Sequence, residues 1–197
     1  MGNKLEERVE KLEKIVSQIL GKKALKIKVG IGDTFELNGL TWKVIDITDK
    51  GYLCLAERLK ESMQFDKSCN DWRESTLRHY LNTEFYKELA KEVGEENIIP
   101  FERNLLSLDG QTEYGTCQDK VSLLNVDEYR KYRSLLPNTD DYWWWLISPW
   151  STPCNGYDGL VTVVSPSGNV DDDDYGNNIG VRPFCIFSSS IFESEEE

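Results

Sequence analysis

The sequence lacks the residue patterns that build metal sites and catalytic centres. Its 197 residues include a single His, and its five cysteines are widely spaced, with no Cys-x-x-Cys pair. Structural zinc sites need closely spaced Cys and His ligands, and an odd number of scattered cysteines gives no disulfide framework. No Gly-rich phosphate loop and no Gly-x-Ser-x-Gly elbow occurs. We therefore expect reduced, buried thiols, no metal, no cofactor and no enzyme active site.

Long apolar runs and an excess of positive charge are missing too. No stretch approaches the roughly 18 apolar residues of a membrane-spanning helix, and the N-terminus is charged throughout, unlike a signal peptide. The net charge is −12, without a basic patch that would attract nucleic acid or an anionic membrane. The sequence thus predicts a protein made in the cytoplasm, with no nucleic-acid partner and no membrane insertion.

Residues 1–21 have the spacing of a coiled-coil helix. Apolar residues alternate in steps of four and three, at Leu5, Val9, Leu12, Val16 and Ile19. An apolar stripe on a short helix must be covered, because the lone helix is marginally stable in water. We expect residues 3–20 to join copies of the chain into a homo-oligomer, either dimer or trimer. The alternative is an amphipathic helix that packs on its own domain.

Residues 26–192 are expected to form one mixed α+β domain, followed by an acidic tail at residues 193–197. Strands are predicted within residues 26–59, because β-prone runs alternate there with hairpin signals such as Asn38-Gly39. These runs are short and contain alternating apolar residues, as half-buried strands do. The first part of the domain is therefore predicted to be a set of antiparallel strands.

Helices and further strands are predicted in the rest of the domain. The apolar spacing predicts two helical runs within residues 71–93, beginning at Asp71 or Ser75 and ending at Gly94, and a third helix over 119–136. Later strands are expected to begin at Trp143, at Leu160 and at Val181, the last reaching Phe187. Long polar loops connect these strands, and binding residues usually lie in such loops.

Segment 150–179 has an unusual composition. Eighteen of its 30 residues are Ser, Gly, Asn, Asp or Tyr, a mixture found in antibody paratopes and also in ordinary long loops. Lys, Glu, Gln and Met are absent from residues 132–192, although the other 136 residues contain 41 of them. At that density about 18 would be expected, and the depletion of Lys and Glu in strands explains only part of the gap.

The acidic run from Asp171 to Asp174 has two interpretations. A calcium loop starting at Asn169 would use Asp171 and Asp173 as ligands. Asp174 and Gly180 then stand where such a loop needs Gly and Glu. The other interpretation is a solvated loop, because adjacent carboxylates repel and must face water without a cation. We favour the solvated loop.

Several motifs in the chain resemble a known family. The motifs are Trp144-Trp145-Leu146-Ile147-Ser148-Pro149, Gly168-Asn169-Val170, Gly180-Val181-Arg182-Pro183-Phe184, Trp72-Arg73-Glu74-Ser75-Thr76-Leu77-Arg78 and Asp119-Lys120-Val121. Together they resemble the variable proteins of diversity-generating retroelements, and also a wider bacterial domain family of unknown function, over roughly residues 30–187. The resemblance implies a C-type-lectin-like fold, which formylglycine-generating enzymes also use.

The resemblance also implies a function. In such proteins a reverse transcriptase copies a template with adenine errors, and the copy overwrites the C-terminal coding region. Randomised AAC or AAT codons never encode Lys, Glu, Gln, Met or Trp, which matches the gap noted above. The implied variable region, about residues 147–181, would bind an unknown protein or cell-surface ligand from a phage, prophage or bacterial surface. The implied ligand-binding residues are Ser151, Thr152, Asn155, Tyr157, Asp158, Ser165, Ser167, Asn169, Asp171, Asp172, Asp173, Asp174, Tyr175, Asn177, Asn178 and Ile179.

The family has relatives without a retroelement, which leaves an alternative function open. Those relatives share the Trp-Leu-x-Ser-Pro and Gly-Val-Arg-Pro motifs, so the chain could be a non-diversified structural or interaction domain in a phage or bacterial surface particle. The resemblance gives Arg182 a structural role, in contact with a buried carboxylate or carbonyl. Calcium-dependent lectin tripeptides are absent, and Cys154 and Cys185 lie far apart in sequence. Sugar binding and formylglycine-generating activity are therefore not expected.

Overall fold

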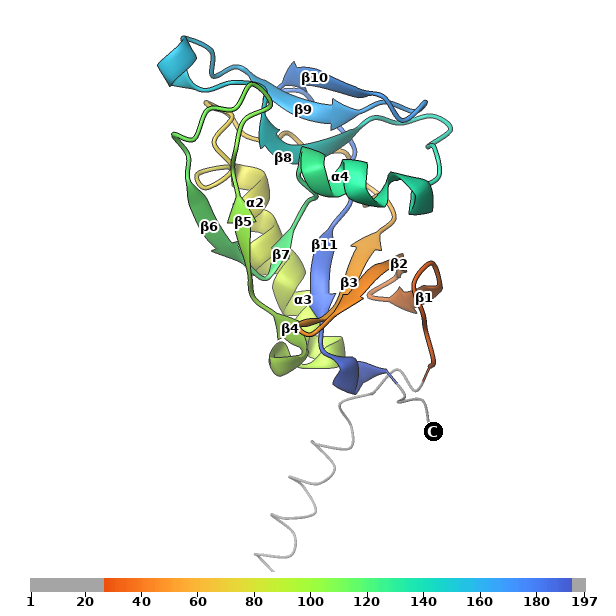
Figure 1. Ribbon diagram of the computed structural model, residues 1–197. Helices are drawn as coiled ribbons and strands as arrows, with labels where there is room; N and C mark the ends of the chain where they lie inside the picture. The colour runs from red at the N-terminus through yellow and green to blue at the C-terminus, as the bar shows by residue number, and fades with distance from the viewer. Residues whose placement is uncertain (1–26, 193–197) are drawn as a thin grey trace, which may run out of the picture.

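A six-stranded sheet organises the first part of the molecule. The computed structural model describes residues 27–192, so the predicted coiled coil and the acidic tail lie outside the described residues. Figure 1 shows a mixed α+β structure with antiparallel sheets. The order in the largest sheet is β1-β2-β3-β11-β4, with β7 also paired to β11. Its strands are β1 (Thr34–Leu37), β2 (Leu40–Thr48), β3 (Gly51–Ala56), β4 (Ile98–Ile99), β7 (Val121–Ser122) and β11 (Phe184–Phe187).

Two tight turns set the hairpins at the start of this sheet. Asn38 and Gly39 have positive φ angles of 52° and 66°, as the two-residue turn between β1 and β2 requires. Gly51 begins β3 at φ 136°, and a Cβ there would lie 2.3 Å from the backbone oxygen of Phe187. This close approach exists because the C-terminal strand β11 returns to pair with β3. The strands predicted within residues 26–59 are confirmed.

One helical segment covers one face of the sheet. It consists of α2 (Thr76–Tyr80), a π-helical turn η1 (Leu81–Phe85) and α3 (Tyr86–Val93), and the short turn η2 (Glu95–Asn97) follows. Ser75 caps its start, since its side chain accepts a hydrogen bond from Arg78 N at 3.1 Å. Gly94 follows its end at φ 88°. The helices predicted within residues 71–93 are confirmed, with Ser75 rather than Asp71 as the cap.

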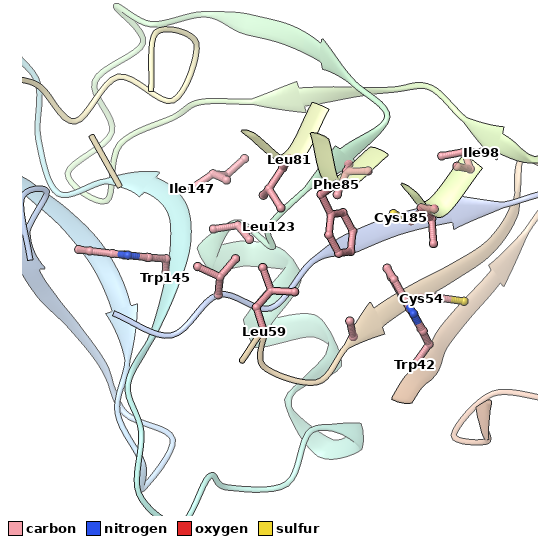
Figure 2. Close-up of a cluster of buried hydrophobic side chains, with 14 of the residues drawn as sticks. Trp42, Cys54, Leu59, Leu81, Phe85, Ile98, Leu123, Trp145, Ile147 and Cys185 are labelled. Carbon is pink, nitrogen blue, oxygen red and sulfur yellow. The ribbon is translucent and has the colours of Figure 1, made fainter. Parts of the chain in front are cut away.

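The core lies on both faces of the six-stranded sheet. Cys185 and Phe187 of β11 join one apolar cluster, while Phe184 and Ile186 join the other. This alternation follows from the two-residue period of a strand. Figure 2 shows the first cluster, to which the helical segment contributes Leu81 and its neighbours. Full burial of one such apolar side chain contributes roughly 1.5–3 kcal/mol.

A three-stranded antiparallel sheet lies at one end of the molecule, in the order β10-β9-β8 (Figure 1). Its strands are β8 (Trp144–Pro149), β9 (Leu160–Val164) and β10 (Val170–Asp174). Trp145 and Ile147 belong to the first apolar cluster, and Trp144 and Leu146 to the second. Trp143 precedes β8 and is 38% exposed, so the predicted strand starts one residue too early.

Strand β10 departs from the predicted polar loop. Its run Asp171–Asp174 pairs with β9, from Asp171 opposite Val163 to Asp174 opposite Leu160. Asp disfavours strands, but β9 is a buried Val- and Thr-rich strand whose backbone groups need partners. Tertiary pairing therefore overrides local preference. The last strand is also shorter than predicted and begins after Pro183, which has no N–H to donate.

Helix α4 is much shorter than the third helix predicted over residues 119–136. It covers Val126–Tyr132 and continues into the turn η3 (Arg133–Leu135). Asn125 and Glu128 form a capping box that starts it. The preceding residues are extended, because Leu123 and Leu124 enter opposite apolar clusters. Before them lies the hairpin of β5 (Phe101–Asn104) and β6 (Thr116–Asp119). The prediction of a helix from residue 119 is wrong.

Candidate functional site

Strand β10 forms the outer edge of the three-stranded sheet. Among the described residues it pairs only with β9, and Figure 1 places it at the opposite end of the molecule from η5 (Ser189–Ile191). Successive side chains point to opposite faces, so Asp171 and Asp173 share one face and Asp172 and Asp174 the other. Charged side chains on an edge strand discourage pairing with another sheet.

Main-chain hydrogen bonds hold the loop that follows β10. Phe65 N donates to Tyr175 O at 2.9 Å, and Met63 and Ile179 exchange two backbone hydrogen bonds of 3.0 and 3.1 Å. Tyr175 N donates to Gly159 O at 3.2 Å, which ties this loop to the segment before β9. Backbone groups therefore set much of the path of the loop, and side chains of the same segment add two hydrogen bonds of 2.8 and 2.6 Å.

Most of the sixteen residues predicted to bind a ligand lie at the surface. Nine are exposed: Asn155, Tyr157, Asp158, Ser167, Asn169, Asp171, Asp174, Asn177 and Asn178. Four are half-buried: Asp172, Asp173, Tyr175 and Ile179. Three are buried: Ser151, Thr152 and Ser165.

The three buried residues correct the expectation that all sixteen residues bind a ligand. Ser151 Oγ donates to Asp109 Oδ2 at 2.6 Å, and Thr152 is fully buried just before the turn η4 (Pro153–Asn155). Ser165 Oγ accepts a hydrogen bond from Asn169 N at 3.0 Å, inside the β9–β10 turn. These buried side chains stabilise the loops internally. They are Ser and Thr, residue types that also occur at exposed loop positions, so residue type alone does not separate the two groups.

The exposed residues form two groups joined by β10. Tyr157, which is 53% exposed, and Asp158 belong to the loop before β9, whereas Ser167 and Asn169 belong to the turn before β10. A five-residue strand such as β10 spans about 16 Å. The two groups thus lie along one sheet edge rather than on opposite sides of the molecule.

This edge carries mostly negative charge, with Arg133 beside its β9–β10 turn at Gly168. Residues 134–181 contain seven Asp and no Lys or Arg. Burial and the neighbouring charges of Asp171 and Asp173 raise the pKa of Asp172. Within residues 27–192, no group of three or more His, Cys, Asp or Glu side chains is placed to hold a metal ion. Adjacent carboxylates of β10 diverge to opposite faces, so the run forms neither a calcium loop nor a loop at all.

The motif around Trp72 and Arg78 forms a buried network that positions the helical segment. The Asp119 side chain is fully buried and accepts hydrogen bonds from Trp72 Nε1 at 2.8 Å and Arg78 Nε at 2.6 Å. Arg78 also donates to the backbone oxygens of Arg73 and Gln118, both at 3.0 Å. These residues therefore act as framework, which sequence reasoning had recognised only as family motifs.

The cysteines are free, but not all of them are buried. Cys54 and Cys185 are buried, as expected, and Cys154 is exposed. Burial raises the pKa of the Cys117 thiol to about 11. A hydrogen bond to Glu113 raises the pKa of the Cys154 thiol. The expectation of five buried thiols is therefore wrong: Cys69 and Cys117 are half-buried, and the loop before β9 exposes Cys154 to solvent.

Together these features define an α+β domain with two antiparallel sheets and an acidic, loop-flanked edge. The chain belongs to the family described as Domain of unknown function (DUF6273), whose model matches residues 49–189. The match includes the buried Trp72 network and all of the edge formed by β10. No curated protein and no solved structure matches the chain. Within the part of the chain that the structure describes, no helix is long and apolar enough to cross a membrane.

Proposed function

We propose that this chain is a recognition domain that binds a protein or cell-surface ligand and that its binding surface is diversified between gene copies. We call this the β10 surface: Asn155, Tyr157, Asp158, Ser167, Asn169, Asp171, Asp174, Asn177 and Asn178, all exposed. The observation that carries the proposal is that backbone hydrogen bonds help to hold the loop after β10, while all nine of these side chains are exposed.

The composition of the C-terminal third supports diversification. Residues 132–192 lack Lys, Glu, Gln and Met, four of the five amino acids that adenine-directed changes at AAC or AAT codons cannot produce. The fifth is Trp, which occurs in the implied variable region only at Trp150, a position that we assign to the fixed scaffold. Strand propensity alone depletes Lys and Glu, but it does not remove both of them completely from 61 residues. The backbone hydrogen bonds that hold the loops remain when exposed side chains are replaced.

The β10 surface has the ingredients of a binding site for a basic partner. Tyr157 offers a large exposed ring, and aromatic side chains often dominate binding energy at interfaces. The exposed carboxylates of Asp158, Asp171 and Asp174 favour a partner with Lys or Arg and a salt-dependent association rate, and Arg133 is the cation beside the turn at Gly168. A standard interface buries about 800 Å² on each partner, which nine exposed residues and their neighbours can supply.

The proposal extends to the fold and to assembly. The return of β11 to β3, which leaves the loops and the second sheet at one end, supports the C-type-lectin-like fold that the resemblance implies. The helix predicted for residues 3–20 would join several copies and convert weak single contacts into avidity. The setting would be a phage, prophage or bacterial surface.

Sequencing the gene from independent isolates tests diversification. We expect amino-acid differences to concentrate on the β10 surface, with an imperfect repeat of the codons for residues 145–184 and a reverse transcriptase gene nearby. Matched control positions are Glu88 and Lys91, which are exposed on the helical segment. Equal variation at both sets, without a repeat, would contradict diversification and favour a non-diversified interaction domain.

A paired substitution tests recognition itself. We expect labelled full chain to bind intact cells of some bacterial isolates in a saturable way. Tyr157→Ala with Asn177→Ala should weaken that binding at least about tenfold, as loss of an interface hot spot does. Glu88→Ala is the control and should bind as the unmodified chain does. Equal binding by all three proteins would rule out the β10 surface as the binding site.

A further inference from the structure

Arg182 is a buried cation with a single protein hydrogen bond. Its side chain is only 6% exposed, and its Nε donates to Ala56 O at 3.0 Å, which confirms the predicted carbonyl partner. Its Cζ lies 4.9 Å from the centre of the Trp144 ring. Nη1 and Nη2 form no hydrogen bond or ion pair with any described residue. Burial lowers the pKa of Arg182, because water no longer stabilises its charge.

The guanidinium of Arg182 lines a pocket between the segment after β3 and the segment before β8. The pocket has a volume of about 400 Å³. Neither Nη1 nor Nη2 is among the buried polar atoms that are sealed from solvent without a partner. The charged and aromatic residues that line the pocket are Glu57, Arg58, Asp140, Asp141, Tyr142 and Arg182. Both nitrogens therefore face the pocket rather than a protein acceptor, and a bound anion can accept their hydrogen bonds.

Arg58 supplies a second guanidinium to the same pocket. Its Cζ lies 4.5 Å from the centre of the Tyr142 ring, and among the described residues it forms no ion pair. Gly180 makes room for this stack, since a Cβ there would lie 3.0 Å from both Arg58 Cδ and Tyr142 Cδ2. Thr139 Oγ1 donates to Tyr142 O at 2.6 Å and so fixes the loop that carries the ring. The walls of the pocket are therefore held in place before any ligand binds.

The charges in the pocket select for a ligand with two opposite charges. Two guanidinium groups would repel a simple cation, and the carboxylates of Glu57, Asp140 and Asp141 would repel a simple anion. We propose that the pocket binds a small zwitterion of the free α-amino acid type, whose carboxylate pairs with Arg182 and Arg58. Its ammonium group faces the exposed carboxylates of Asp140 and Asp141.

Size and geometry agree with this ligand class. Small-molecule sites have volumes of roughly 300–1,000 Å³, so this pocket falls at the small end. A guanidinium holds a carboxylate through two parallel hydrogen bonds, which Nη1 and Nη2 of Arg182 are free to donate. The inference is independent of the β10 surface, because none of the lining residues belongs to that surface.

Calorimetric titration with the twenty free L-amino acids tests the proposal. We expect at least one to bind the full chain with a Kd of about 1 mM or tighter. Acetate and methylammonium carry one half of the ligand each, and both should bind at least about tenfold more weakly. The binding amino acid should also quench or shift tryptophan fluorescence, because Trp144 stacks on the guanidinium that the carboxylate would contact.

Three variants locate the binding site without altering the buried Arg182. Arg58→Gln and the double variant Asp140→Asn with Asp141→Asn should each weaken binding about tenfold, since each removes one half of the charge pattern. Arg130→Gln removes an exposed cation outside the pocket and should change nothing. The proposal is overturned if no amino acid binds below about 10 mM, if acetate binds as tightly as the amino acid, or if neither pocket variant weakens binding.

Discussion

The substitution Asp119→Asn tests the buried network that joins the helical segment to β6. In the native protein, the Asp119 carboxylate accepts from both Trp72 Nε1 and Arg78 Nε. Asn keeps one acceptor oxygen and turns the other position into an NH2 donor, which must face one of these two donors. The substitution also leaves the Arg78 guanidinium without its counter-charge.

The expected loss of stability follows from burial of the two partners. Removing one member of a fully buried pair costs about 3–5 kcal/mol. The Asp119 side chain is 0% exposed and the Arg78 side chain 25% exposed, and Arg78 keeps its two hydrogen bonds to backbone oxygens. We therefore expect Asp119→Asn to lower the free energy of unfolding by about 2–3 kcal/mol, which most domains survive.

Urea unfolding followed by tryptophan fluorescence measures this loss, as a shift of the midpoint at constant slope. Glu88→Gln is the matched control, because it removes the carboxylate of an exposed pair with Lys91 and should cost less than about 0.5 kcal/mol. Arg78→Gln combined with Asp119→Asn should cost less than the sum of the single losses, because the pair is then removed together. A loss below about 1 kcal/mol for Asp119→Asn would refute the reasoning.

Three further substitutions test other parts of the framework. Burial alone would raise the pKa of Asp66, but hydrogen bonds from neighbouring backbone and hydroxyl groups lower it overall. The stability from Asp66 is therefore present above its unfolded pKa of about 4 and lost as pH falls through the lower folded value. Asp66→Asn should flatten the acid side of a stability–pH curve, and an unchanged curve would exclude this role. Asn125→Ala should lower the free energy of unfolding in urea by about 1 kcal/mol, because the helix cap is lost. An unchanged free energy of unfolding would show that the Asn125 side chain does not stabilise the helix. Gly51→Ala should lower the melting temperature by several degrees, because its Cβ would meet a backbone oxygen of β11 at 2.3 Å, and an unshifted transition would show that the strands can separate there.

Local patterns predicted the elements whose stabilising contacts are close in sequence. The hairpin at Asn38-Gly39 needs two residues with positive φ, and these two residues adopt it readily. The helical segment has its cap at Ser75 and its stop at Gly94, and its apolar spacing faces the core. Such features could be predicted because the physical cause lies within a few residues of the effect.

Local sequence patterns gave wrong predictions where pairing with a distant segment determines the backbone conformation. Asp171 to Asp174 form a strand because β9 offers unpaired backbone groups, whatever the strand preference of Asp. Asp119, Val121 and Ser122 are extended because they pair with β5 or β11, although the apolar spacing of their segment also fits a helix. Short apolar runs do not distinguish these alternatives by periodicity alone.

The same division applies to the candidate sites. Composition marked the region of the β10 surface, because exposed loops are rich in small polar residues. It could not separate exposed Ser167 from buried Ser165, since the two hydroxyls differ only in which side of one turn they occupy. Nor could it find the pocket at Arg182, which brings residues from three separate segments together.

By itself, the sequence determined the class of the protein: an acidic α+β domain with the motifs of one family and a C-terminal third of unusual composition. These properties depend on residue type, order and local spacing, all of which are written along the chain. Only the tertiary structure decided which polar side chains reach solvent, which strand lies at the edge of its sheet and which buried cation keeps unused hydrogen-bond donors. Each of these is set by contacts between segments far apart in sequence, and therefore by the packing of the whole domain.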